Sequence, residues 1–299
     1  MLYKNTFYLF RMMCIFVHVG TSIIIYCIIY IQMNIYTASL KGKRPTNEDA
    51  HQILLNLGKS NKYAPINFYG IFDGHGGAFV SNFLKDVLPR YFIDKRLNYP
   101  LNKRYVTACY NHLNTLLKTK YAKNVESTGS TCLVIIEYKQ NDNRYLNILN
   151  TGDSRAIICK NNIAHPLTID HKPNFPSEKS RIESVGGKIA FDGLDWRIKD
   201  LSVSRSFGDI SSQPCVTYLP DMFRYTITKA DQFIVMACDG LWDVMSNQDV
   251  ANYVLLHCYN PVTNKRINKD FSVAKKLAEF AISKGSSDNV SIIIIFNDS

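Results

Sequence analysis

The sequence predicts an α+β fold in which antiparallel sheets are covered by helices. Short β-rich runs follow one another closely, and tight turns at residues 140–143 and 151–154 join consecutive runs. A parallel crossover needs about a dozen residues or more, so connections this short indicate antiparallel hairpins. Longer segments with a helical period lie between and after the runs, which favours helices packed on the sheets.

Strands are expected where β-branched and aromatic residues cluster between turn residues. No conformation is predicted for residues 210–230, which are irregular and contain Pro214 and Pro220. The expected strands are a start at 36–40 and the runs 66–72, 131–138, 145–150, 154–160, 200–205, 233–238 and 290–296.

Three segments show the apolar period of a helix. The first, at 79–87, directly follows a pair of glycines, and the second, at 105–117, contains neither Gly nor Pro. The third covers 273–281, where we expect Ser272 to cap the helix and Gly285 to end it.

The composition is that of an ordinary globular protein. Of the 299 residues, 20% are charged and 46% are hydrophobic. The formal net charge of +10 is compatible with anionic partners. Because the Lys and Arg residues are scattered and form no basic block, we interpret the charge as a solvated surface and expect no nucleic-acid binding.

The eight cysteines show no Cys-x-x-Cys pattern and no framework typical of a small disulfide-rich domain. Cys132, Cys159 and Cys238 lie inside apolar runs, where a free thiol behaves as a small hydrophobe. This usage favours a reducing compartment.

The N-terminal segment differs from the rest of the chain. Residues 12–33 contain no Asp, Glu, Lys or Arg and match the roughly 20 residues that cross a bilayer as a helix. We expect residues 1–35 to be a hydrophobic membrane anchor and 36–299 to form the folded body. Basic residues on both flanks leave the orientation open. A buried segment or a misassigned start are alternatives; a signal peptide fits less well, because cleavage near Ala38 would cut the first strand.

Three aspartates at the edges of predicted strands indicate a metal site. Asp73 and Asp239 follow strands, and Asp288 precedes one. Carboxylates suit Mg²⁺ or Mn²⁺, and no His-x-x-x-His or paired cysteines stand nearby to favour zinc. The carbonyl of Gly74 could supply another oxygen, since glycine lets a backbone approach an ion closely. A single such Asp is more typical of a turn or cap, but the set favours a metal.

Two further side chains suggest a reaction centre. Arg44 has a planar guanidinium that suits phosphate, and His75 titrates in a range that allows proton donation near neutrality. The acidic pair Glu48 and Asp49 would bind metal through water. Alone, Arg44 would be a surface residue and His75 a turn residue. Together with the aspartates they predict a phosphomonoester hydrolase.

Seven motifs, in order along residues 36–297, resemble those of the metal-dependent Ser/Thr protein phosphatases of the PPM (type 2C) family. The motifs are Arg44-x-x-x-Glu48-Asp49, Phe-Asp-Gly-His-Gly-Gly at 72–77, Ser-Thr-Gly-Ser-Thr at 127–131, Gly-Asp-Ser-Arg at 152–155, Leu-Ser-Val-Ser-Arg-Ser-Phe-Gly-Asp at 201–209, Asp-Gly-Leu-Trp-Asp at 239–243 and Ser-Asp-Asn at 287–289.

The resemblance implies a β-sandwich of two antiparallel sheets flanked by helices. It also implies hydrolysis of phosphoserine and phosphothreonine by direct attack of a water or hydroxide that bridges two Mg²⁺ or Mn²⁺ ions, without a phosphoenzyme. Asp73 would then bridge both ions, Gly74 would bind one through its carbonyl, and Asp239 and Asp288 would bind the other. Asp153 matches a position linked to a third, weaker ion.

By the same resemblance, Glu48 and Asp49 would hold metal-bound waters, Arg44 would bind the substrate phosphate, and His75 would protonate the leaving oxygen. Each of these positions has the expected residue type. The alternatives are a catalytically inactive pseudophosphatase that acts as a binding scaffold, and a two-metal hydrolase of lipid or nucleotide phosphates.

The expected partners are phosphorylated proteins, and we expect a monomer. Phosphoprotein substrates and free Mg²⁺ would locate the catalytic domain, 36–299, on the cytosolic side of a membrane. A soluble cytoplasmic or nuclear protein is the alternative location.

Overall fold

The computed structural model describes residues 14–19, 22–27, 35–57, 66–92, 97–267 and 272–297, with side chains from residue 35 onward. The chain divides into two compact units, Met1–Asn34 and Ile35–Ser299.

In the first unit, β1 (Cys14–Val19) pairs antiparallel with β2 (Ser22–Cys27), with Val19 opposite Ser22. The sequence here is rich in Ile, Val and Tyr, which favour strands. The helix predicted over residues 12–33 is therefore wrong where the structure describes this stretch. Within the described ranges, no helix has both the length and the apolar character needed to cross a membrane.

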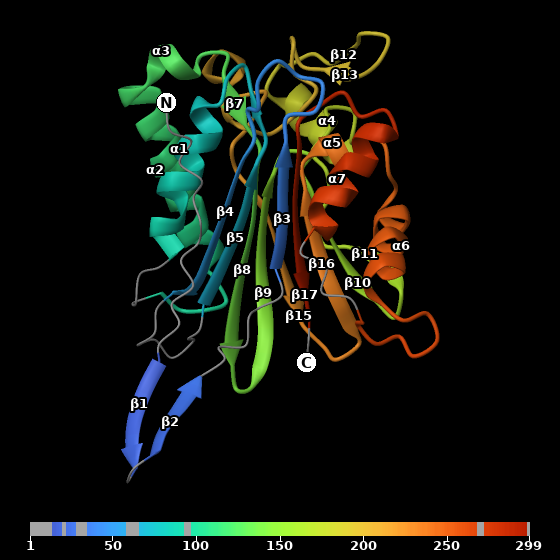
Figure 1. Cartoon of the computed structure of the whole chain (residues 1–299). Helices are drawn as coiled ribbons and strands as arrows, with labels where there is room; N and C mark the ends of the chain where they lie inside the picture. The colour runs from blue at the N-terminus through green and yellow to red at the C-terminus, as the bar shows by residue number, and fades with distance from the viewer. Residues whose placement is uncertain are drawn as a thin grey trace, which may run out of the picture. The chain divides into compact units, whose positions relative to one another are not determined.

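The second unit contains two antiparallel five-stranded sheets, which lie side by side in Figure 1. Their hairpins confirm the antiparallel pattern expected from the short turns. The first sheet has the order β11 (Ile163–Pro166), β10 (Arg155–Lys160), β16 (Asp231–Ala237), β17 (Val290–Phe296), β3 (Ile35–Leu40). The second has the order β15 (Asp221–Thr226), β9 (Asn143–Thr151), β8 (Cys132–Gln140), β5 (Ile66–Phe72), β4 (Ala50–Leu57).

Helices cover both outer faces (Figure 1). α1 (Phe79–Val87) contacts β4 and β5, and α2 (Lys103–Lys120) shares their core. α6 (Asn247–Cys258) and α7 (Val273–Ser283) contact the first sheet. The shorter elements are β6 (Gly74–His75), η1 (Leu88–Phe92), α3 (Ala122–Val125), β7 (Gly129–Ser130), α4 (Pro176–Ser184), β12 (Ala190–Phe191), β13 (Trp196–Arg197), β14 (Phe207–Gly208), η2 (Ile210–Ser212) and α5 (Asp239–Trp242).

The core follows the alternation of side chains along the strands. On β16, Phe233, Val235 and Ala237 belong to the apolar core shared with α6 and α7. Ile234 and Met236, between them, are also buried. Successive side chains of a strand point to opposite faces, so the second pair faces the other sheet. The strand is buried on both sides, and this makes it a rigid support for the residues that follow it.

One predicted strand is absent. Residues 200–205 are all described, yet they form only isolated bridges, at Leu201 and Arg205. The polar side chains of this stretch bind elsewhere: Ser204 Oγ donates to Glu178 Oε2 at 2.8 Å, and Arg205 Nε donates to Glu178 Oε1 at 3.0 Å. These bonds attach the segment to α4 instead of to a sheet. Sequence patterns also missed β4, β15, α4 and α6, and β11 of the first sheet.

Candidate metal centre

Acidic residues gather at one end of the sandwich because several strands end or begin there. Asp73 directly follows β5 of the second sheet, and Asp153 lies in the turn between β9 and β10. Asp239 follows β16 after one intervening residue, and Asp288 comes two residues before β17. Since β16 pairs with β17, the fold carries the last two side chains to the same edge of the first sheet.

The carboxylates meet across the two sheets. Oxygen atoms of Asp73, Asp153 and Asp239 lie within 4.8 Å of one another. A second group overlaps the first, because ligand atoms of Asp49, Asp73 and Cys238 also lie within 4.8 Å of one another. We call these five residues the acidic cluster, together with Asp288, whose charge acts on Asp73, Asp239 and Asp49. Asp73 belongs to both groups, so it occupies the middle of the cluster.

The charges in the cluster strongly oppose ionisation. Burial, followed by the charges of Asp239 and Asp49, raises the pKa of Asp73 well above its usual range. Burial and the charge of Asp153 do the same to the pKa of Asp239. Burial raises the pKa of Asp49 to about 6. Carboxylates that repel one another in this way gain a large stabilisation from a bound cation.

The unpaired atoms of the cluster fit a hard divalent ion. Among the described residues, neither carboxylate oxygen of Asp49 has a hydrogen-bond partner, and Oδ1 of Asp153 also has none. Buried acceptors without partners cost free energy, which ligation by a metal would recover. These donors are carboxylate oxygens, as Mg²⁺ and Mn²⁺ prefer.

Cys238 does not make the site a thiolate site. Burial, with the charges of Asp49 and Asp73, raises the pKa of the Cys238 thiol well above its ordinary value. The sulfur is already hydrogen-bonded: Cys238 Sγ donates to the carbonyl of Asn289 at 3.4 Å and accepts from the Ser291 amide at 3.1 Å. It therefore remains a neutral thiol that packs below the carboxylates.

Arg44 reaches the edge of the cluster. Its guanidinium Nη2 donates to Asp288 Oδ2 at 2.6 Å, and the two side chains are 56% and 35% exposed. An exposed guanidinium beside a cation site is suitably located to bind an anion held by that cation.

Asn289 fixes the loop that carries Arg44. Its side-chain Nδ2 donates to the carbonyls of Lys41 at 2.8 Å and Thr46 at 2.9 Å. Its Oδ1 accepts from the Glu48 amide at 2.8 Å. One buried amide side chain thereby holds both ends of the loop against the edge of β17.

Glu48 lies beside the turn after Asp73. Its Oε2 accepts from the Gly77 amide at 2.9 Å, and its backbone carbonyl accepts from Ser81 Oγ at 2.5 Å. A β-carbon at Gly74 would lie 2.3 Å from that same carbonyl, so only glycine fits there. Glu48 and Gly74 are thus packed together, with Asp73 next to them.

Asp73 is held by backbone and hydroxyl contacts. Its amide donates to Thr131 Oγ1 at 3.1 Å, and its carbonyl accepts from the Thr131 amide at 2.9 Å. Thr131 Oγ1 also lies 2.8 Å from Ser154 Oγ, beside Asp153. These hydroxyls support the sheet and turns, and they link the two acids at the same time.

His75 is oriented by a residue distant in sequence. Its Nε2 lies 2.8 Å from Oδ2 of the buried Asp209, which also accepts from Ser206 Oγ. A β-carbon at Gly129 would overlap both His75 Nε2 and Asp209 Oδ2, so glycine leaves room for this contact. Burial lowers the pKa of His75, but the hydrogen bond and the charge of Asp209 outweigh it, and the pKa is raised above its ordinary value.

The comparison with known families decides the classification. A family model described as "Protein phosphatase 2C" matches residues 34–290. The chain belongs to the protein phosphatase 2C family. This confirms the resemblance inferred from the motifs. Protein phosphatase activity on phosphoproteins is the function of this family.

Relatives span viruses and plants. The chain is similar to a PP2C-like domain-containing protein of Acanthamoeba polyphaga mimivirus, with 47% identity over 50% of this chain and 93% of that one. It is also similar to "Probable protein phosphatase 2C 54" of Oryza sativa subsp. japonica, with 31% identity over 85% of this chain and 70% of the rice protein.

Solved structures confirm the protein phosphatase 2C fold. The serine-threonine phosphatase 2C from Toxoplasma gondii aligns with a TM-score of 0.72 and 22% identity, over 88% of this chain and 94% of that one. At this identity the likeness concerns the fold alone. It confirms the predicted sandwich of antiparallel sheets flanked by helices.

Sequence reasoning missed three residues of this protein phosphatase 2C site. Asp209 and Asn289 end motifs that were recognised, but neither was given a role. Lys172, whose Nζ donates to Asp153 Oδ2, was not singled out at all. A lysine outside the recognised motifs gives no local signal that it points at an acid 19 positions earlier.

Proposed function

We propose that the chain is a Mg²⁺- or Mn²⁺-dependent protein serine/threonine phosphatase, with residues 36–299 as its catalytic domain and the acidic cluster as its active site. The observation that carries the proposal is the cluster itself. Carboxylates from both sheets, of which Asp153 is buried and the others are half-buried, lie together and repel one another, and some of their oxygens have no partner among the described residues. Such an arrangement is costly unless it binds cations.

The metal ligands of the proposal are the residues expected from the sequence. Asp73 would contact two ions from the middle of the cluster, with the Gly74 carbonyl beside it, and Asp239 and Asp288 would hold an ion at the edge of the first sheet. The remaining acids, Glu48, Asp49 and Asp153, would bind through waters or hold a further, weaker ion. When bound, the ions neutralise phosphate charge and make a water nucleophilic near neutral pH.

Arg44 would bind the phosphate of the substrate. In the structure its guanidinium contacts Asp288 at one edge of the cluster and remains largely exposed. A phosphate dianion that binds next to Asp288 would accept hydrogen bonds from the planar guanidinium of Arg44, and these bonds would fix its orientation. The anchoring of the loop by Asn289 supports this role, because it fixes where the arginine starts.

His75 would donate the proton to the leaving serine or threonine oxygen. Alkoxide leaving groups are strongly basic, so their departure benefits from a proton. Asp209 accepts from the imidazole and supports its charged form. The other ring nitrogen, Nδ1, would then be the atom that donates to the substrate.

The test uses the purified full-length chain and a phosphothreonine peptide. We expect hydrolysis with Mn²⁺ or Mg²⁺, none with EDTA, and recovery when excess Mn²⁺ is returned. Phosphatidic acid and a nucleoside monophosphate, assayed in parallel, should be poor substrates. Mn²⁺ binding without hydrolysis of any substrate would instead identify a pseudophosphatase, and preference for the lipid or nucleotide would identify the other two-metal class.

A matched pair of variants localises the activity. Asp288→Asn removes a proposed ligand, whereas Asp142→Asn changes an aspartate that is 100% exposed in the β8–β9 turn. Only the first should abolish metal-dependent hydrolysis. Equal activity of the two variants would mean that the acidic cluster is not the active site.

A further inference from the structure

Lys172 extends into the acidic cluster from outside the recognised motifs. Its ammonium Nζ donates to Oδ2 of Asp153, and the side chains are 32% and 1% exposed. The other oxygen of Asp153, Oδ1, has no partner among the described residues and lies in the group formed with Asp73 and Asp239. Asp153 therefore contacts a protein cation with one oxygen and leaves the other available.

The backbone of Lys172 is held beside Asp153. The amide of the preceding His171 donates to the Gly152 carbonyl at 3.1 Å, and the Gly152 amide donates to His171 Nδ1 at 3.1 Å. Since Nδ1 accepts, the ring proton is on Nε2, which donates to Asp221 at 3.1 Å. The lysine thus has a fixed starting point next to the turn that carries its partner.

The charge of Lys172 acts on more than one acid. It opposes the rise in the pKa of Asp239 and of Asp243, the exposed aspartate at the end of α5. At the other side of the cluster, the oxygens of Asp49 have no such cation among the described residues. The cluster is therefore asymmetric: it is partly neutralised at Asp153 and not neutralised at Asp49.

We propose that Lys172 is a built-in counter-ion of the acidic cluster, and that it competes with a divalent cation for Asp153. An ion that binds at Asp49 and Asp73 leaves the lysine in place. An ion that uses Asp153 must displace the ammonium or bind beside a like charge, which weakens it. As a result, one side chain, Lys172, makes the affinity for an ion at Asp153 lower than the affinity for an ion at Asp49 and Asp73. The inference rests on the metal centre proposed above.

Mn²⁺ binding to the full-length chain tests the competition. Titration calorimetry and equilibrium dialysis would compare wild type with Lys172→Met. We expect Lys172→Met to bind the weakest detectable Mn²⁺ about tenfold more tightly, or to bind one ion more at a fixed concentration, because the competing cation is gone. Lys172→Arg keeps the charge and should stay close to wild type.

Two controls assign the effect to Asp153. The double variant Lys172→Met/Asp153→Asn should lose the gain, because the released ligand is removed. Lys179→Met removes an exposed lysine whose Nζ lies 3.9 Å from Glu183, and it should bind Mn²⁺ as wild type does. A double variant that keeps the gain would overturn the assignment to Asp153.

Melting in EDTA tests the counter-ion role without metal or catalysis. Lys172→Met should melt at a lower temperature than wild type, because a buried carboxylate loses its partner. The added Asp153→Asn change should restore most of the loss. An unchanged melting temperature, or identical Mn²⁺ titrations of wild type and Lys172→Met, would overturn this inference and leave the metal centre standing. If no variant binds Mn²⁺, the metal centre fails and the competition fails with it.

Discussion

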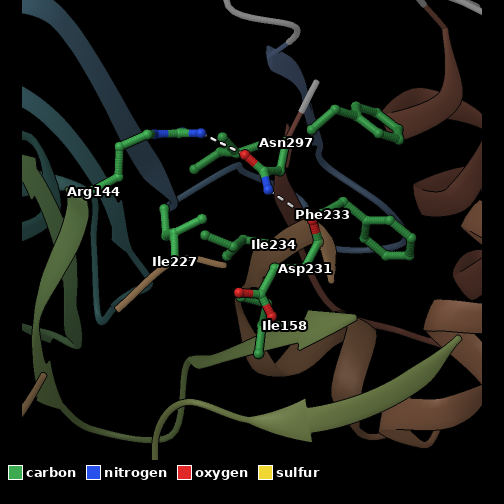
Figure 2. A pocket seen from close by; sticks show the side chains of 9 residues that line it. Arg144, Ile158, Ile227, Asp231, Phe233, Ile234 and Asn297 are labelled. Carbon is green, nitrogen blue, oxygen red and sulfur yellow. Dashed lines mark hydrogen bonds between the residues drawn. The ribbon is translucent and has the colours of Figure 1, made fainter. Parts of the chain in front are cut away.

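The two ends of the sandwich differ in whether their charged side chains have hydrogen-bond partners. At the end remote from the acidic cluster, Arg144 Nε donates to Glu137 Oε1 at 2.6 Å, and another guanidinium nitrogen donates to Asn297. Asn297 in turn donates to the Asp231 carbonyl at 2.7 Å (Figure 2). The contacts leave a cavity of only about 10 Å³. At the cluster end, carboxylates face one another with oxygens that have no partner among the described residues.

The difference indicates which end stabilises the fold and which end is suited to bind a cation. Strand β16 begins at Asp231, in the paired network, and ends just before Asp239, in the unpaired cluster. The same strand therefore connects a region in which Arg144, Glu137 and Asn297 are hydrogen-bonded to a region in which carboxylates repel one another. A rigid, paired end provides the stability that the repulsive end lacks.

The largest expected effect is at the cluster end. Asp239→Asn should lower the rate of phosphothreonine peptide hydrolysis by about 10³-fold or more, because it removes a ligand and a charge from the metal centre. The melting temperature in EDTA should stay equal or rise, since one repelling carboxylate is gone. Steady-state kinetics with Mn²⁺ and thermal melting check both. Asp142→Asn is the control, and a fall in stability alongside activity would mean that Asp239 is structural.

At the cluster end, His75 forms a pair with Asp209. His75→Gln should slow hydrolysis of a phosphothreonine peptide about 10²-fold but affect p-nitrophenyl phosphate far less, because nitrophenolate leaves without a proton. The ratio of the two kcat values is the measurement, with the exposed His165→Gln as control. An equal loss on both substrates would argue against proton donation by His75.

Substitutions at the paired end should change the stability of the protein and leave its kcat unchanged. Arg144→Met should lower the free energy of unfolding by about 2 kcal/mol, because the buried Glu137 loses its cationic partner and keeps only the hydrogen bonds from Asn67 and Tyr69. Lys139→Met, which breaks an exposed pair with Asp142 at 3.4 Å, should cost less than about 0.5 kcal/mol. Urea denaturation measures both, and kcat of the folded fraction should not change. A lower kcat in Arg144→Met would break the division between the two ends.

The last expected effect is on how the stability of the metal-free protein depends on pH. The pKa values of Asp73 and Asp239 are raised on folding, and that of Asp49 is raised to about 6, so the folded state holds protons that the unfolded chain has lost. Their contribution to stability is present at about pH 4 and is lost as pH rises through the raised pKa values.

Asp239→Asn should therefore make the fall in stability between pH 5 and pH 7 shallower, by up to about 1.4 kcal/mol per pH unit for one proton. Unfolding in urea with EDTA at several pH values gives the slopes. For Arg144→Met, the slope of the free energy of unfolding against pH should equal that of wild type. Equal slopes in wild type and Asp239→Asn would show that this carboxylate does not titrate as the cluster geometry requires.

Local pattern predicted much of the fold. The apolar runs at 66–72 and 290–296 are strands at the same residues, and the motifs correctly identified the family. Tertiary contacts overruled pattern elsewhere: 200–205 looks like a strand, but its Ser and Arg side chains bind α4. The uncharged stretch 12–33 has the length of a membrane helix, yet its described parts pair as strands.

The sequence singles out the acidic residues of the candidate site, but it does not single out the residues that contact and orient them. Asp73, Asp239 and Asp288 stand out because each adjoins an apolar run. No local signal shows that Asp209 accepts from His75, 134 positions away. Nor does one show that Lys172 points at Asp153, because both contacts depend on how loops cross the end of the sandwich.

The position of β17 has a consequence for synthesis. This last strand lies between β16 and β3, and the residues just before it pair with Arg44, 244 positions earlier, and hold the Arg44 loop. A nascent chain that has not reached residue 288 has neither Asp288 nor Asn289, and its β3 lacks the strand with which it pairs. The edge of the first sheet and the Arg44 loop can therefore take up their places only after residues 288–296 have been made.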